Sequence, residues 1–89
     1  MALKVEFDPD ALKELATLDE SVQRRIFRYF RERVSPLKDP RALGKPLTGD
    51  KKGLWRYRIG DYRAIGSISD TASTVTIYRI GHRRHIYDR

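Results

Sequence analysis

The stretch that decides the fold is LWRYRIGDYRAIG, residues 54–66. On both sides of a central Gly60–Asp61 pair, apolar or aromatic residues alternate with polar ones, which is the pattern of two antiparallel strands joined by a two-residue turn. Counting outward from that turn pairs residues 59, 58, 57 and 56 with residues 62, 63, 64 and 65. This register places two like charges, Arg58 and Arg63, directly opposite each other, and a slip of one residue would reverse every assignment of side chains to faces.

Alternation sorts the side chains of this hairpin onto two faces. The face that points away from the predicted core carries Arg56, Arg58 and Arg63. Opposed arginines cost a sheet stability, and sequences break such local rules chiefly at functional sites. Because guanidinium groups match phosphate oxygens bidentately, we interpret this face as an anion site, with arginines that splay into solvent or pair with acidic residues as the alternative. The core face is predicted to carry Trp55, Tyr57, Ile59, Tyr62, Ala64 and Ile68.

A strand and two helices are predicted before the hairpin. Residues 3–7 alternate as a half-buried strand. Asp8 and Pro9 are typical of the N-cap and the first position of a helix, which is expected to end near residue 17 or 18. A longer helix with an apolar stripe is predicted from about residue 19 or 21 to Val34.

The remainder of the chain is predicted to be a loop followed by strands. Residues 35–53 contain three prolines and three glycines and show little periodicity, so they are interpreted as a loop. Strands are predicted at residues 54–59, 62–69 and 73–80. The sequence therefore predicts an α+β fold, in which two N-terminal helices pack on one face of an antiparallel sheet of about four strands.

Size and composition limit the class of protein. At 89 residues the chain has material for one core, so residues 1–89 are expected to form a single domain. No apolar run is long enough to cross a bilayer, and the N-terminus lacks the pattern of a signal peptide, so we expect a cytoplasmic protein without a membrane span. Because the chain has no cysteine and no carboxylate cluster near its two histidines, no metal or other cofactor is expected.

Charge is the most informative number in the composition. Nineteen Lys and Arg against twelve Asp and Glu give a formal net charge of +7 and a pI near 10.1. From residue 51 onward there are nine Lys and Arg and three Asp, so most of the excess lies in the second half. This distribution favours a polyanionic partner, either nucleic acid or an acidic protein, over a charge that serves only solubility. The second predicted helix also has a basic face, which is interpreted as solvated but open to a partner: Arg24, Arg25, Arg28, Arg31 and Arg33.

The last segment, YRIGHRRHIYDR at residues 78–89, interleaves basic and aromatic side chains. Such a surface can hold backbone phosphates and stack bases. Histidine as a residue type titrates near neutral pH and can move protons, which makes His82 and His85 candidates for proton transfer. The alternative is a charged C-terminal tail without chemistry, in which either histidine has only a structural role.

The order of these features resembles the RelE/ParE superfamily of toxins from bacterial toxin–antitoxin modules. The resemblance spans the chain and is carried by VEFDPDALKEL, the two predicted helices, LGKPLTG, LWRYRIGDYRAIG and TIYRIGHRRHIYDR. It implies a small α+β domain with two helices on a curved antiparallel sheet. RelE-type members are endoribonucleases that cut mRNA in the ribosomal A site, whereas ParE-type members share the fold and inhibit DNA gyrase.

The resemblance also implies the residues of a RelE-type active site. The positions that match lie in the two central strands and the C-terminal segment: Arg56, Arg58, Arg63, Arg83 and Tyr87. Two of these arginines stand where lysine is usual, and a guanidinium cannot easily act as a general base. His85 is therefore predicted to transfer the proton, ahead of His82. Further contacts with the substrate are predicted at Lys51, Lys52, His82 and Arg84.

The predicted function is that of a toxin from a type II toxin–antitoxin system. It would cleave mRNA on the ribosome without a metal, by attack of the 2′-hydroxyl on the adjacent phosphorus. The resemblance further implies a toxin that is monomeric alone and is inhibited by a cognate antitoxin with an acidic or amphipathic segment. A ParE-like gyrase inhibitor is the main alternative. A module that binds nucleic acid without cleaving it is a weaker one, and it predicts salt-sensitive binding.

Overall fold

The 54–66 hairpin forms the centre of the sheet and has the predicted register. In the computed structural model, which describes residues 3–86, β3 (Trp55–Ile59) pairs antiparallel with β4 (Tyr62–Ser69). Arg58 lies opposite Arg63, as the alternation predicts. Gly60 has a φ of 59° at the first turn position, a left-handed conformation that glycine adopts without the cost that a Cβ would add. The tight turn therefore depends on a glycine at this position.

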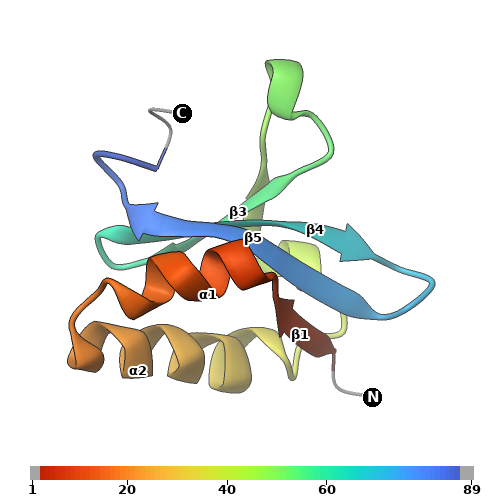
Figure 1. Cartoon of the computed structure of the whole chain (residues 1–89). Helices are drawn as coiled ribbons and strands as arrows, with labels where there is room; N and C mark the ends of the chain where they lie inside the picture. The colour runs from red at the N-terminus through yellow and green to blue at the C-terminus, as the bar shows by residue number, and fades with distance from the viewer. Residues whose placement is uncertain (1–2, 87–89) are drawn as a thin grey trace.

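Three more strands complete a five-stranded sheet in the order β1-β5-β4-β3-β2 (Figure 1). β1 (Lys4–Phe7) pairs in parallel with β5 (Thr74–His82), and β2 (Gly44–Pro46) pairs antiparallel with β3. The predicted α+β class is confirmed, with one strand more than the expected four and with one parallel pair. β2 lies inside the segment interpreted as a loop. Its three residues include a glycine and a proline and show no alternation, so the sequence pattern cannot predict this strand. Alternation also carries no information on strand direction, so it cannot predict the parallel pair.

Both helices lie on one face of the sheet (Figure 1). α1 (Pro9–Ala16) begins where predicted, and the carboxylate of Asp8 accepts a hydrogen bond from the backbone N–H of Asp10 at 3.1 Å. α2 (Glu20–Tyr29) is shorter than predicted, because the chain continues as one π-helical turn, η1 (Phe30–Val34). The backbone N–H of Ser35 closes this wider turn by donating to the carbonyl of Phe30 at 2.8 Å. The second helical segment therefore still ends at the predicted residue.

The core lies between these helices and the sheet. Tyr57 is fully buried, and its hydroxyl donates to the carbonyl of Pro40 at 2.7 Å. Burial raises the pKa of Tyr57 to about 12, so its phenol stays protonated at neutral pH. The buried hydroxyl is thus satisfied while the ring fills the core. The predicted core face of the hairpin is confirmed, since Tyr57, Ile59 and Ala64 are buried, and Trp55, Tyr62 and Ile68 pack against them.

Contacts made by Arg41 attach the connection over residues 35–53 to the sheet. Besides β2 it contains two short 3-10 turns, η2 (Pro40–Ala42) and η3 (Gly49–Lys51). The guanidinium of Arg41 donates to the two carboxylate oxygens of Asp70 at 3.0 and 2.8 Å, and it lies 5.6 Å from the ring centroid of Trp55. These contacts hold η2 against β3 and the β4–β5 turn. Beyond β2, the connection projects away from the helices (Figure 1).

Protonation of Asp70 is expected to weaken this attachment in acid. The hydrogen bond from Arg41 holds the pKa of Asp70 below its usual value of 3.8. A carboxyl whose pKa is lowered by folding stabilises the folded state above its ordinary pKa, and that contribution disappears as the pH falls through the folded-state value. The difference in unfolding free energy between the wild type and Asp70→Asn should therefore be constant near neutral pH and shrink below about pH 4. Urea denaturation at a series of pH values measures it, and a difference that persists undiminished at the lowest pH would contradict this role of Asp70.

Candidate functional site

The face of the sheet opposite the helices is flanked by two projecting segments. One is the loop between β2 and β3, and the other is the chain that follows β5; both rise on the side away from α1 and α2 (Figure 1). Arg56 and Arg63 belong to the two central strands of this open face, and Lys51 and Lys52 belong to the loop. The fold therefore brings candidate residues from separate parts of the chain to one side of the molecule.

The three arginines of the hairpin have different surroundings. Arg56 is half-buried, Arg58 is exposed, and Arg63 is only 9% exposed. The Nη1 atom of Arg63 donates to the carbonyl oxygens of Gly60 and Tyr62 at 2.8 and 2.9 Å. Arg63 therefore turns back onto the hairpin turn, whereas Arg58 opposite it remains in solvent. The separation of the two side chains relieves part of the repulsion between Arg58 and Arg63, which a bound phosphate is predicted to relieve further. The two hydrogen bonds also fix the position of the Arg63 guanidinium.

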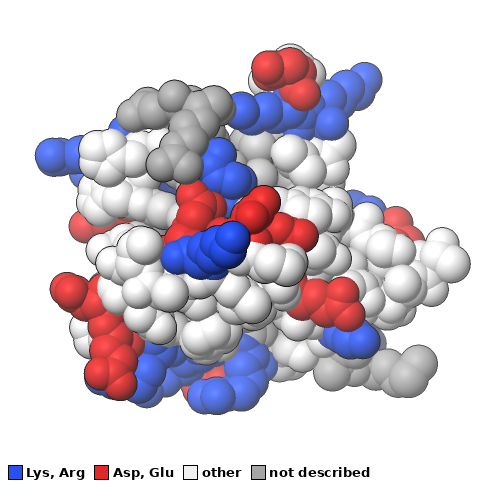
Figure 2. All heavy atoms as spheres, viewed as in Figure 1, with Lys and Arg blue, Asp and Glu red and all other residues white. Residues whose placement is uncertain are grey.

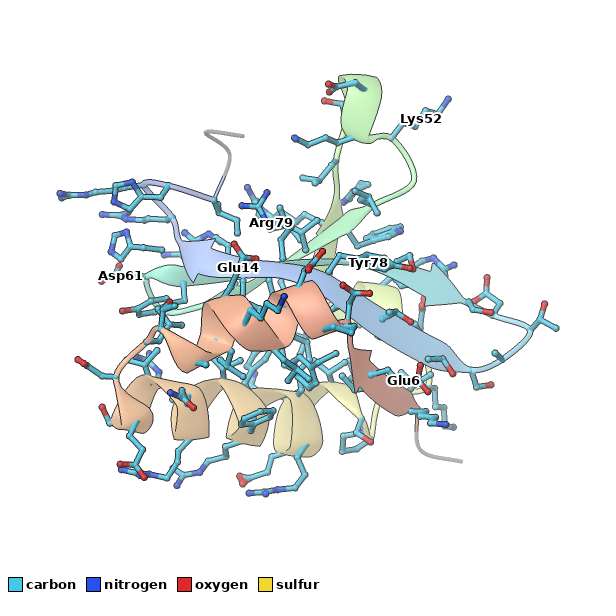
Figure 3. All side chains as sticks on the ribbon, viewed as in Figure 1. Glu6, Glu14, Lys52, Asp61, Tyr78 and Arg79 are labelled. Atoms are coloured by element: carbon cyan, nitrogen blue, oxygen red, sulfur yellow. The ribbon has the colours of Figure 1, made fainter. Side chains whose placement is uncertain are left out.

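Arg83 is fastened to the same hairpin turn. Its backbone N–H donates to the carbonyl of Asp61 at 2.8 Å, and its Nε lies 3.8 Å from a carboxylate oxygen of Asp61. Figure 3 shows Asp61 at the outer end of the sheet. Because both side chains are more than half exposed, the ion pair contributes little and the backbone hydrogen bond makes the main attachment. Arg83 is thus brought to the end of the hairpin that carries Arg63.

The two histidines lie toward α1 rather than among the hairpin arginines. His82 is opposite Tyr62, whose side chain packs against the core, and the two ring centroids are 5.5 Å apart. His85 is exposed, with its ring centroid 6.1 Å from that of His82. Both line a hollow of about 660 Å³ together with Lys13 and Glu14 of α1. The predicted site residues are therefore divided between the open face and the rim next to α1.

A backbone hydrogen bond sets the tautomer of neutral His82. The N–H of Arg84 donates to Nδ1 of His82 at 3.2 Å, so the proton of the neutral ring lies on Nε2. This arrangement orients the ring and leaves the Nε2–H group of His82 as a hydrogen-bond donor. The preference for His85 over His82 in proton transfer stays a prediction.

Glu14 supports the site, and sequence reasoning did not single it out. β1 pairs with β5 only as far as Ile77, so the last residues of β5 lie at an outer edge of the sheet. The Oε1 atom of Glu14 accepts the backbone N–H of Ile80 at 3.0 Å and lies 3.1 Å from Nε of Arg79 (Figure 3). Glu14 thereby holds the part of β5 that leads to Arg83. No local pattern in the sequence points to a partner 65 residues away.

The predicted substrate contacts are spread around the site. Lys51 is half-buried, and Lys52 is exposed on the projecting loop (Figure 3). Arg84 is exposed after β5, and Tyr87 lies outside the described residues. Within residues 3–86, no group of three His, Asp or Glu side chains is placed to hold a metal ion. None of the helices in this part of the chain is long and apolar enough to cross a membrane.

The chain is similar in sequence and in structure to known toxins. The family model described as "ParE toxin of type II toxin-antitoxin system, parDE" matches residues 5–87. Toxin RelG of Mycobacterium tuberculosis is 32% identical over 89 residues, which cover 100% of both chains. Toxin RelE of the same organism is 43% identical over 78 residues, which cover 86% of this chain and 77% of the relative. The crystal structure of the toxin–antitoxin complex RelBE2, also from M. tuberculosis, matches with a TM-score of 0.85 at 29% identity and covers 93% of each chain.

Proposed function

Because the chain belongs to the ParE toxin family of type II toxin–antitoxin systems, we propose that it is a RelE-type, ribosome-dependent endoribonuclease. The observation that carries the proposal is the placement of Arg56 and Arg63 on the central hairpin, with Arg83 fastened to its turn. The relatives named RelG and RelE support the RelE type over the ParE type. The proposed substrate is mRNA in the ribosomal A site.

The proposed reaction uses a nucleophile that RNA itself supplies. The 2′-oxygen attacks the adjacent phosphorus, the bond from phosphorus to the 5′-oxygen breaks, and the products are a 2′,3′-cyclic phosphate and a free 5′-hydroxyl. A base takes the proton of the 2′-hydroxyl and an acid protonates the leaving 5′-oxygen. The main task of the protein is to stabilise the negative charge that develops on the phosphorane. Arg56, Arg58 and Arg63 would do so, with Arg83 near the leaving oxygen.

Proton transfer is assigned to the C-terminal segment. A guanidinium keeps its proton at accessible pH, so the arginines cannot provide the base. We assign this step to His85 first and His82 second, and we assign Tyr87 to stacking on a substrate base or donating a proton. Contacts with the RNA backbone around the reacting phosphate are assigned to Lys51, Lys52 and Arg84.

A cognate antitoxin is the proposed inhibitor. The solved RelBE2 structure is a toxin–antitoxin complex, and it covers 93% of this chain. An antitoxin with an acidic or amphipathic segment would complement the net charge of +7 and could cover the open face. Without that partner, the toxin is proposed to be a monomer.

Substitution of His85 by glutamine tests the assignment of the proton. If the imidazole transfers a proton, mRNA cleavage in a translation extract should fall by about 100-fold or more, with the cleaved ends mapped to confirm the cyclic phosphate. Lys13→Gln, which changes another residue lining the same hollow, should cleave like the wild type. Unchanged cleavage by a folded His85→Gln would assign the base elsewhere, whereas no ribosome-dependent cleavage by the wild type would reject the proposed function itself.

Inhibition of DNA gyrase is the second candidate function. The observation that favours it is the match to a family model described as a ParE toxin. The two functions are separated by comparing mRNA cleavage in the extract with gyrase-mediated DNA breaks in a supercoiling assay. DNA breaks without mRNA cleavage would select the ParE type.

A further inference from the structure

A second group of arginines lies between α2 and the end of β3. Arg25, Arg28, Arg33 and Arg58 line a hollow of about 400 Å³, which is within the size range of sites for small ligands. β2 pairs with β3 only as far as Tyr57, so Arg58 and the hairpin turn lie on a free edge beyond it. Arg58 therefore belongs both to this hollow and to the row of hairpin arginines.

The hollow carries a net positive charge, because its lining has more arginines than carboxylates. Among the described residues, no ion pair involves any of its four arginines. By contrast, two neighbouring arginines on the same helical segments are paired, Arg24 with Glu20 at 3.4 Å and Arg31 with Glu32 at 3.9 Å. Among residues 3–86, Glu32 is the one carboxylate that lines the hollow, so the four arginines exceed the carboxylates there by three charges. Figure 2 shows basic side chains gathered along α2.

The fold holds these groups close to the hairpin turn. A Cβ at Gly60 would come within 2.5 Å of Nη2 of Arg25, so the guanidinium of Arg25 lies directly against the turn. Tyr29 also lines the hollow, and burial raises the pKa of its phenol, which therefore stays protonated and can donate a hydrogen bond. An anion in the hollow would meet guanidinium groups and one neutral donor, which are the groups that bind phosphate oxygens well.

We propose that this hollow binds a phosphate of an RNA backbone at a point separate from the cleaved bond. The identity of the polyanion rests on the proposed function. Arg58 lies opposite Arg63, so a single polynucleotide could follow positive charge from the open face, around the free edge of β3, to α2. Positive charge that continues around an edge suits a chain of regularly spaced phosphates better than one isolated carboxylate. An acidic protein segment is the competing occupant.

The test measures binding of RNA that cannot be cleaved. The probes are a short single strand and a hairpin, both 2′-O-methylated, and their affinity for the full chain is measured over a series of salt concentrations. Arg25→Gln/Arg33→Gln should reduce the slope of log K against log salt by about 0.7 for the strand, because the hollow contacts one phosphate and each phosphate contact contributes about 0.7. Arg24→Gln/Arg31→Gln removes the same charge from the same helical region and should leave the slope unchanged. Arg25→Lys/Arg33→Lys controls for folding and should retain the slope, since it retains the charge.

Each outcome decides for or against the second phosphate site. If the salt slope is reduced with the single strand, the hollow contacts mRNA next to the cleaved bond. If it is reduced with the hairpin alone, the hollow contacts folded RNA. Wild-type slopes with both probes, or equal reductions in the two glutamine pairs, would overturn the proposal. Unchanged RNA binding together with weaker binding of a glutamate-rich peptide would overturn it in favour of a protein partner. Because the probes lack the attacking hydroxyl, the result can be read even if the chain proves not to be a ribonuclease.

Discussion

Replacing Arg63 by alanine is expected to reduce mRNA cleavage in a translation extract by about 100- to 1,000-fold. The position of Arg63 is fixed, because its Nη1 donates to the carbonyls of Gly60 and Tyr62. A guanidinium that is already held in place stabilises the developing charge without reorganising during the reaction. Its loss should therefore lower the rate of the chemical step more than it weakens RNA binding.

Two further variants make this experiment specific for the guanidinium. Arg63→Lys keeps the charge but loses the planar fork, so its cleavage should lie between those of the wild type and Arg63→Ala. Ser67→Ala changes another residue of β4, away from the turn, and should cleave like the wild type. Since Arg63 is buried, thermal melting must show that each variant is folded at the assay temperature. A folded Arg63→Ala that cleaves at the wild-type rate would remove Arg63 from the active site.

Substituting Gly66 by alanine is expected to destabilise the fold by about 3 kcal/mol. Gly66 lies opposite Ile77, next to the irregularity at which β5 accommodates the extra residue Tyr78. A Cβ at Gly66 would collide with the carbonyl oxygen of Thr76, and a backbone oxygen cannot rotate away as a side chain can. The two strands would have to separate locally, which weakens the pairing that holds β5 in the sheet.

Urea unfolding of Gly66→Ala and of the neighbouring Ser67→Ala measures this effect. Ser67 is partly exposed, and its hydroxyl makes a surface hydrogen bond with that of Tyr78, so Ser67→Ala should stay within about 0.5 kcal/mol of the wild type. Wild-type stability of Gly66→Ala would mean that the strand irregularity can shift to accept a methyl group.

The hairpin register could be predicted because one local signal determines it. The Gly60–Asp61 pair sets the turn, and period-two alternation then assigns each side chain to a face without any knowledge of the rest of the chain. The direction of β1 and the existence of β2 depend on contacts between distant segments, and neither has a local pattern. The π-helical turn that begins at Phe30 likewise cannot be predicted from the sequence, because its apolar residues have the spacing of a continuing α-helix.

The candidate site was predictable to a similar extent. Position in the hairpin predicts that Arg58 and Arg63 oppose each other, but not that Arg63 folds back onto the turn while Arg58 lines a hollow with α2. Those outcomes depend on which carbonyls and which helix lie nearby, and only the assembled fold determines that. For the same reason, the sequence predicts a substrate contact at His82 but not that its ring lies toward α1.

The pairing of β1 with β5 has a consequence for the timing of toxin assembly. Val5 pairs with Val75, and Glu14 contacts Arg79 across 65 residues, so the first elements of the chain are completed only by the last strand. Contacts between such distant segments close a long stretch of chain, and they cannot form while the C-terminal part is still being synthesised. The arginines of the hairpin therefore leave the ribosome before the strand that supports them. A nascent chain therefore carries the arginines of the candidate site before the last strand can give them their arrangement.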